Sequence, residues 1–179
     1  MRARLGAALL AVPLLLGGCG AGEEEPADDA TASAAAEQAW NPCDGLDPVA
    51  VQEALGEPVT ADRGSTAAPR CALVPQAEGG AVLDANYLVF PAGLDAAWDQ
   101  MGAPDDGSVT EPAIAGADGA RMVVNPGTEV LGVTGFVQVG EVVLVVNAAD
   151  AAPYDRAPVV AAVKETMRQL AAYAGANPP

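Results

Sequence analysis

Carboxylates and cysteines are the side chains in this sequence that could do chemistry, because the chain contains no histidine. Without histidine there can be no Ser-His-Asp or Cys-His catalytic centre and no histidine-ligated metal. Paired carboxylates could still work as general acid and base if their surroundings separate their pKa values. The candidate pairs are Asp84 with Glu78, and Asp95 with Asp99 one helical turn apart. We interpret Asp95 and Asp99 as a solvated helix face and predict no catalytic residue.

Calcium is the metal that acidic residues would suit, and Asp105, Asp106 and Glu111 lie close together in the chain. Their spacing does not follow the D-x-D-x-D-G pattern that wraps a calcium ion in oxygen ligands. The sequence also lacks a Walker A loop, a G-x-S-x-G motif and an H-E-x-x-H motif. The chain is therefore expected to hold no metal and no cofactor.

The charge balance excludes another class of function. The chain has 8 Lys and Arg against 24 Asp and Glu, a formal net charge of −16. Nucleic-acid binding needs clustered cations to neutralise phosphates, so no nucleic-acid partner is expected. The acidic residues are scattered, and we interpret them as a source of solubility. Attraction of cations or basic partners is the alternative.

The N-terminus indicates export. Arg2 and Arg4 precede an apolar stretch over residues 5–16, which is shorter than the roughly 20 residues of a membrane-spanning helix. It suits the hydrophobic region of a signal peptide. The tetrapeptide Leu16-Gly17-Gly18-Cys19 resembles the lipobox of bacterial lipoproteins. In those proteins the cysteine is acylated and becomes the first residue of the mature chain. The resemblance implies a lipid anchor at Cys19 on the outer face of the cytoplasmic membrane. An ordinary secretory signal is the alternative.

Composition predicts how the rest of the chain is divided. Residues 1–18 would be the signal peptide, and residues 19–39 the lipidated cysteine with an acidic tether. The tether is too poor in large apolar residues to offset its ordering entropy. A single folded domain is expected over residues 40–174, followed by a flexible tail over residues 175–179.

Cys43 and Cys71 remain once Cys19 is assigned to lipid. Two cysteines in an exported domain favour a disulfide, which would stabilise the fold by about 3 kcal/mol in the chain-entropy model. Two buried thiols are an alternative, and so is a metal pair that would lack further Cys or His ligands.

Three helices are expected. Asp47 and Pro48 should open the first, which Gly56 ends, because Asp caps free N–H groups and Gly suits a helix C-terminus. Apolar spacing predicts a second helix over residues 94–101 and a third over residues 158–173, with Asp155 as N-cap.

Strands are expected over residues 70–74, 81–90 and 119–125, and residues 102–118 are interpreted as a loop. The clearest pattern is a hairpin within residues 129–147, whose turn would be Gly140-Glu141. Strand runs flanked by helices predict an α+β fold, with a largely antiparallel sheet of about five strands. A short N-terminal helix and a longer C-terminal helix would pack on this sheet.

The hairpin is apolar on both faces. Val137, Val139, Val142 and Leu144 would pack under the C-terminal helix, and the opposite face would carry Phe136, Val143 and Val145. If the short helices cover that second face, the result is a closed core. If they do not, Phe136, Val143 and Val145 line an apolar groove for a lipid or a partner's apolar segment, with Trp98 or Tyr87 near its edge.

Several short segments form a recognisable series along the chain: residues 42–46 (PCDGL), Leu55-Gly56, Cys71 at the start of a strand, residues 114–120 (IAGADGA), the Val-rich hairpin and the closing helix. Together they resemble a family of actinobacterial lipoproteins built on a two-cysteine domain of unknown function. The resemblance implies a secreted, lipid-anchored, disulfide-stapled α+β domain, and it implies no catalytic residues.

These observations favour a non-catalytic binding or accessory module in the cell envelope, whose partner would be a protein, a lipid or a small ligand. The alternative is a carboxylate-dependent envelope hydrolase. A pocket in which two desolvated carboxylates converge would favour the hydrolase.

Overall fold

The Val-rich hairpin lies inside the sheet of the computed structural model, which describes residues 40–102 and 108–178. Strands β6 (Val130–Val139) and β7 (Val142–Ala151) are antiparallel and joined by Gly140-Glu141. Gly140 has φ +58°, as the first position of a two-residue hairpin turn requires. The predicted register is confirmed, with Val139 opposite Val142 and Val137 opposite Leu144. Cys19, the expected signal peptide and the expected tether lie outside the described residues.

The sheet has seven strands in the order β1-β2-β3-β7-β6-β5-β4, and every neighbouring pair is antiparallel. The α+β class and the antiparallel sheet are confirmed, but the expected number of about five strands is wrong. The further strands are β1 (Val59–Ser65), β2 (Ala68–Pro75), β3 (Val82–Val89), β4 (Val109–Thr110) and β5 (Gly119–Pro126).

Both strands that the sequence pattern missed lie at sheet edges. In β1 only Val59 is buried, and the register shifts between Asp62 and Gly64, so the strand has no apolar alternation. Edge strands commonly carry such bulges and polar residues. β4 has two residues, too few for any periodicity, and it lies in the segment interpreted as a loop.

The helices begin where the predicted caps stand. Asp47 accepts a hydrogen bond from the Val49 amide at the start of α1 (Pro48–Leu55), and Asp155 accepts one from the Ala157 amide at the start of α3 (Arg156–Ala176). Helix α2 spans Gly93–Met101, and a 3₁₀ turn, η1 (Pro42–Gly45), precedes α1. The expected end of α3 at residue 173 is wrong, because the helix continues to Ala176 and takes in the first residues of the expected tail.

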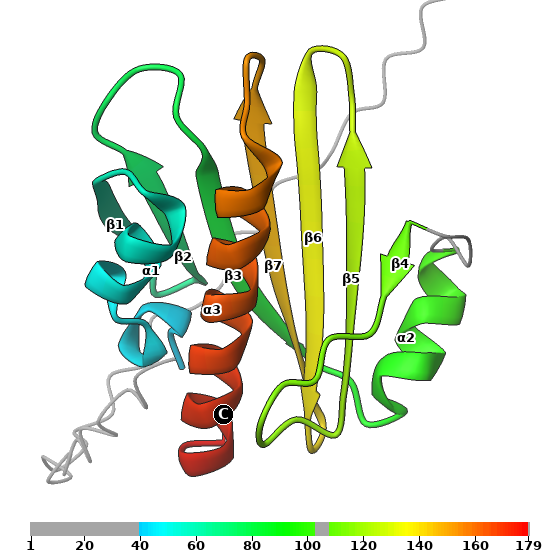
Figure 1. Ribbon diagram of the computed structural model, residues 1–179. Helices are drawn as coiled ribbons and strands as arrows, with labels where there is room; N and C mark the ends of the chain where they lie inside the picture. The colour runs from blue at the N-terminus through cyan, green and yellow to red at the C-terminus, as the bar shows by residue number, and fades with distance from the viewer. Residues whose placement is uncertain (1–39, 103–107, 179) are drawn as a thin grey trace, which may run out of the picture. The chain divides into compact units, whose positions relative to one another are not determined.

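Helices α3 and α1, with η1, cover one face of the sheet, which we call the first face (Figure 1). Leu131, Val137 and Leu144 from the strands are fully buried there against Met167 and Leu170 of α3. The predicted disulfide is confirmed between Cys43 of η1 and Cys71 of β2, whose Cα atoms are 4.9 Å apart. None of the helices in the described part of the chain is long and apolar enough to cross a bilayer.

The opposite, second face of the sheet carries a smaller core under α2. It consists of Leu94 and Trp98 from the helix and Val123, Phe136 and Val143 from the strands. Helix α1 does not reach this face, because it packs against α3. The second face is therefore partly covered by α2 at the end where its side chains are apolar. Farther along the same strands it carries the polar side chains Asp84, Asn86, Thr134 and Asn147.

Candidate functional site

An open pocket lies between the C-terminal half of α2 and the second face of the sheet. Its volume is about 260 Å³, and we call it the apolar pocket. Phe136, Val143 and Val145, the residues that the sequence assigned to a groove, all line it. The remaining lining residues are Leu88, Phe90, Ala97, Gln100 and Met101.

Strand register brings the floor of this pocket together. Phe136 of β6 lies opposite Val145 of β7, and Val143 of β7 lies opposite Leu88 of β3. Side chains directly opposite one another on antiparallel strands share a face, so three strands contribute to one apolar surface. Phe136 is fixed by Trp98, whose ring lies edge-on to it at a centroid distance of 5.3 Å.

The burial of the pocket residues is graded from floor to rim. Val143 is 1% exposed and Phe136 is 8% exposed, whereas Leu88 is 37% and Met101 is 50% exposed. Water therefore reaches large apolar side chains at the rim of a cavity in which Gln100 is the only polar lining side chain among the described residues. An apolar group that entered would remove this surface from water, which stabilises a complex by about 25 cal/mol per Å².

The two aromatic residues expected near the groove are placed differently. Trp98 lies beside the apolar pocket, behind Phe136, and is itself 7% exposed. Tyr87 lies on the first face instead, where its ring contacts Trp40 at a centroid distance of 4.7 Å. Of these two alternatives Trp98 is therefore the one on the face of the groove, because Tyr87 shares the parity of Leu83 and Ala85, which face α3.

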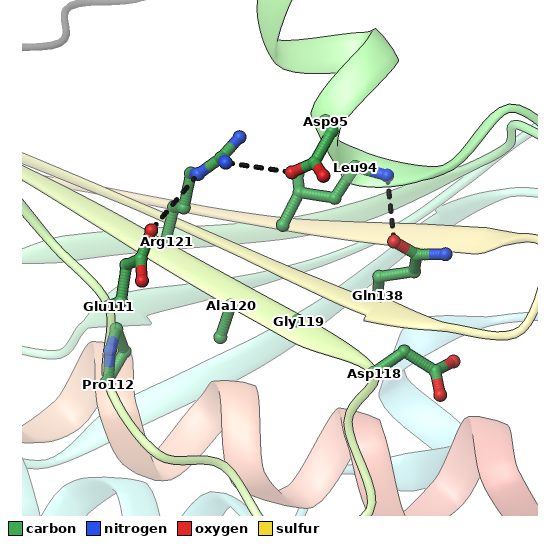
Figure 2. A pocket seen from close by; sticks show the side chains of 9 residues that line it. All are labelled: Leu94, Asp95, Glu111, Pro112, Asp118, Gly119, Ala120, Arg121 and Gln138. Atoms are coloured by element: carbon green, nitrogen blue, oxygen red, sulfur yellow. Dashed lines mark hydrogen bonds and ion pairs between the residues drawn. The ribbon is translucent and has the colours of Figure 1, made fainter.

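A second pocket of about 270 Å³, the polar pocket, lies on the other flank of α2 (Figure 2). Its central side chain is Arg121 of β5, which the sequence pattern did not single out. One guanidinium Nη lies 2.8 Å from Asp95, and Nε lies 3.8 Å from Glu111. The guanidinium carbon stands 4.9 Å from the centre of the Trp98 ring, a cation–π contact. Arg121 therefore fastens α2 to the sheet.

The other polar groups of this pocket support the hairpin turn. Asp118 accepts a hydrogen bond from the Gly140 amide at 2.7 Å, and Gln138 accepts one from the Leu94 amide at 2.8 Å. Gln138 also donates to the Gly140 carbonyl at 3.0 Å. These side chains tie the start of α2 and the hairpin turn together, so we interpret them as structural.

The carboxylates of the polar pocket do not form a desolvated acid–base pair. Asp95 is 91% exposed and Glu111 is 76% exposed, and both face Arg121. Among the other candidates, Asp84 lies 3.8 Å from Arg70, while Glu78 and Asp99 are exposed.

Residues 40–102 and 108–178 contain no group of three or more acidic or cysteine side chains that could hold a metal ion. Asp105 and Asp106, weighed above as calcium ligands, lie outside the described residues.

Within residues 40–102 and 108–178, two carboxyl groups have clearly shifted pKa values, and neither lines the apolar or the polar pocket. The pKa of Glu165 is lowered, chiefly by its hydrogen bond from Arg168. The pKa of Asp150 is raised, first by burial and then by the charge of Glu57. Both groups titrate away from the candidate site.

No family model, curated protein or solved structure matches this chain.

Proposed function

We propose that this protein is a lipid-anchored binding module of the cell envelope, which takes up an apolar group of a lipid or small ligand in the apolar pocket without catalysing a reaction. The observation that carries the proposal is the open pocket with an apolar floor of Phe136, Val143 and Val145. Cavities lined by apolar side chains with few polar groups are the usual form of ligand sites.

The size of the pocket limits what can enter. Its volume of about 260 Å³ is slightly below the roughly 300–1,000 Å³ of sites that enclose a drug-sized molecule. One apolar group, such as part of an acyl chain or a single ring, fits this space better than a whole ligand. The rest of the ligand would then extend past Leu88 and Met101 into solvent.

The proposed location follows from the N-terminal sequence. Acylation of Cys19 and a tether over residues 19–39 would hold the folded domain close to the membrane, where acyl chains are abundant. The intact mass of protein extracted from membranes should correspond to a chain that begins at Cys19 and carries acyl groups. A mature form without lipid, unchanged by Cys19→Ser, would contradict the anchor.

Carboxylate-dependent hydrolysis, the alternative considered from the sequence, is less well supported. It would need two desolvated carboxyl groups facing one cavity. Asp95 and Glu111 are largely exposed and held by Arg121, and Asp118 is bound to the hairpin turn.

Binding of an apolar fluorescent probe tests the proposal in the full chain carrying Cys19→Ser. Leu88→Asp and Met101→Asp place a charge at the partly exposed rim, where folding tolerates it, and each should weaken probe binding at least tenfold. Val89→Asp is the matched control, because Val89 is 57% exposed on the same strand but points to the first face. Equal binding by the rim variants and the control would remove the pocket from consideration.

A further inference from the structure

The cationic side chains of the described residues divide into two groups. Four of them form ion pairs with carboxylates of this acidic chain. These pairs are Arg63 with Asp44, Arg70 with Asp62 and Asp84, Arg121 with Asp95 and Glu111, and Arg168 with Glu165. Arg156 and Lys164 form no ion pair with any residue in the part of the chain that the structure describes.

Arg156 and Lys164 line the same pocket. It lies between β5 and α3 at the edge of the first face and has a volume of about 490 Å³; we call it the cationic pocket. Arg156 is the first residue of α3 and Lys164 follows about two turns later, with Val160 between them on the same side of the helix. Met122 and Val124 of β5, which are 3% and 6% exposed, contribute the apolar floor.

Glu111 also lines the cationic pocket, and it does not neutralise either cation. Its carboxylate faces Arg121 on the side of the polar pocket, with Nε at 3.8 Å (Figure 2). Two positive charges therefore border this cavity without an ion-pair partner among residues 40–102 and 108–178, in a chain whose formal net charge is −16. A chain with so many carboxylates could readily have paired them, as it pairs its four other described cations.

We propose that the cationic pocket binds a small organic anion: a carboxylate or phosphate group joined to a compact apolar body. The anionic group would lie between Arg156 and Lys164, where the planar Arg guanidinium can donate two parallel hydrogen bonds to an oxyanion. The apolar body would contact Met122, Val124 and Val160. A volume of about 490 Å³ lies within the usual range for small-ligand sites.

Electrostatics favours a small anion over an anionic membrane surface. Charges farther apart than a Debye length, about 8 Å at physiological ionic strength, are largely screened. A small ligand in the pocket therefore responds mainly to the charges that line it, which are the cations Arg156 and Lys164 and the carboxylate of Glu111, itself facing Arg121. A broad anionic surface would also face the surplus of acidic side chains and be repelled.

This site is independent of the proposed function. The apolar pocket lies on the second face, and the two pockets share no lining residue. Either proposal can fail while the other stands.

The test is to titrate phenyl phosphate into the full chain that carries Cys19→Ser. Calorimetry and backbone amide NMR shifts measure the binding. Shifts should concentrate at residues 156–164 and 122–124. Arg156→Gln and Lys164→Gln, both at exposed positions, should each weaken binding about tenfold, and the double variant should lose it. Benzyl alcohol, a neutral analogue, should not bind.

Arg168→Gln is the matched control, because it removes a paired cation from the same helix and should change phenyl phosphate binding less than twofold. Unchanged binding in the double variant, or an equal loss in Arg168→Gln, would overturn the proposal. Binding to phosphatidylglycerol vesicles that depends on Arg156 and Lys164, without phenyl phosphate binding, would overturn it in favour of a membrane contact.

Discussion

Cys43 and Cys71 add a covalent link between two parts of the chain that are far apart in sequence. The bond links η1 to β2, next to the edge strand β1, of which only Val59 is buried. Replacing both cysteines with alanine should lower the free energy of unfolding by about 3 kcal/mol, since the unfolded chain regains the entropy of an open loop. Urea denaturation measures this. A reductant should shift the wild type to the same midpoint and leave the variant unchanged.

Glu165 should make stability depend on pH. Its pKa is lowered in the folded state, first by the hydrogen bond from Arg168, with Gln169 donating a further bond at 2.8 Å. A carboxyl group with a depressed pKa stabilises the fold above its unfolded value, near 4.5, and this contribution is lost as the pH falls through the folded value. Glu165→Gln should therefore flatten the loss of stability below about pH 5.

The difference in stability between the wild type and Glu165→Gln isolates the contribution of the Glu165 carboxylate. Asp150 acts in the opposite direction, because burial raises its pKa and protonation at low pH relieves the free-energy cost of burying its charge. Asp150 is present in both chains, so it cancels in a difference of thermal midpoints measured from pH 3 to 7. Glu78→Gln, at an exposed position without an ion pair in the described residues, is the control for the exchange of a carboxylate for an amide. Parallel profiles for wild type and Glu165→Gln would contradict the assignment.

At the scale of elements, the turn between β6 and β7 depends on one glycine. Gly140 has φ +58°, a conformation in which a β-branched side chain is strained. Gly140→Val should destabilise the protein by about 1–3 kcal/mol. Glu141→Ala, at the neighbouring turn position with negative φ, should cost less than about 0.5 kcal/mol. Thermal unfolding of the two variants measures the difference. Equal midpoints would mean that the turn does not require a positive φ at residue 140.

Helix α2 is held to the second face by Arg121 and by the small core around Trp98. Arg121→Gln removes the charge that faces Asp95 and the cation over the Trp98 ring, so α2 should open more often. Amide hydrogen exchange in residues 94–101 should quicken several-fold, while exchange in α3 stays unchanged. Arg63→Gln, which removes an ion pair on η1, is the control. Equal exchange of α2 in both variants would contradict the role of Arg121.

Local sequence signals predicted the elements that obey local rules. The caps Asp47 and Asp155, the hairpin turn and the register of β6 and β7 all follow from neighbouring residues. β1 and β4 could not be predicted in the same way. These two segments are extended because they pair with β2 and β5, and the side chains of β1 are mostly exposed.

At the scale of the whole domain, the sequence predicted two apolar hairpin faces and placed the C-terminal helix over one of them, but it did not predict which helix would cover the other. Strand alternation separates Val137 and Leu144 from Phe136 and Val143 with no knowledge of the fold. The placement of α1 against α3, and of α2 alone on the second face, arises from long-range packing. Arg121 was missed for the same reason, since Asp95 and Glu111 approach it only in the folded chain.

Methyl NMR tests the central claim, that the apolar pocket binds an apolar group, most directly. Hexanol is a suitable probe, because it is neutral and carries a short alkyl chain. Titration of the full chain carrying Cys19→Ser should shift the methyl signals of Leu88, Met101, Val143 and Val145, and Met101→Asp should abolish the shifts. The methyl signals of Val89 and Val130, which are exposed but lie outside the pocket, should not move. Equal shifts at Val89 and Met101, or no saturable shift at the pocket residues, would contradict the account.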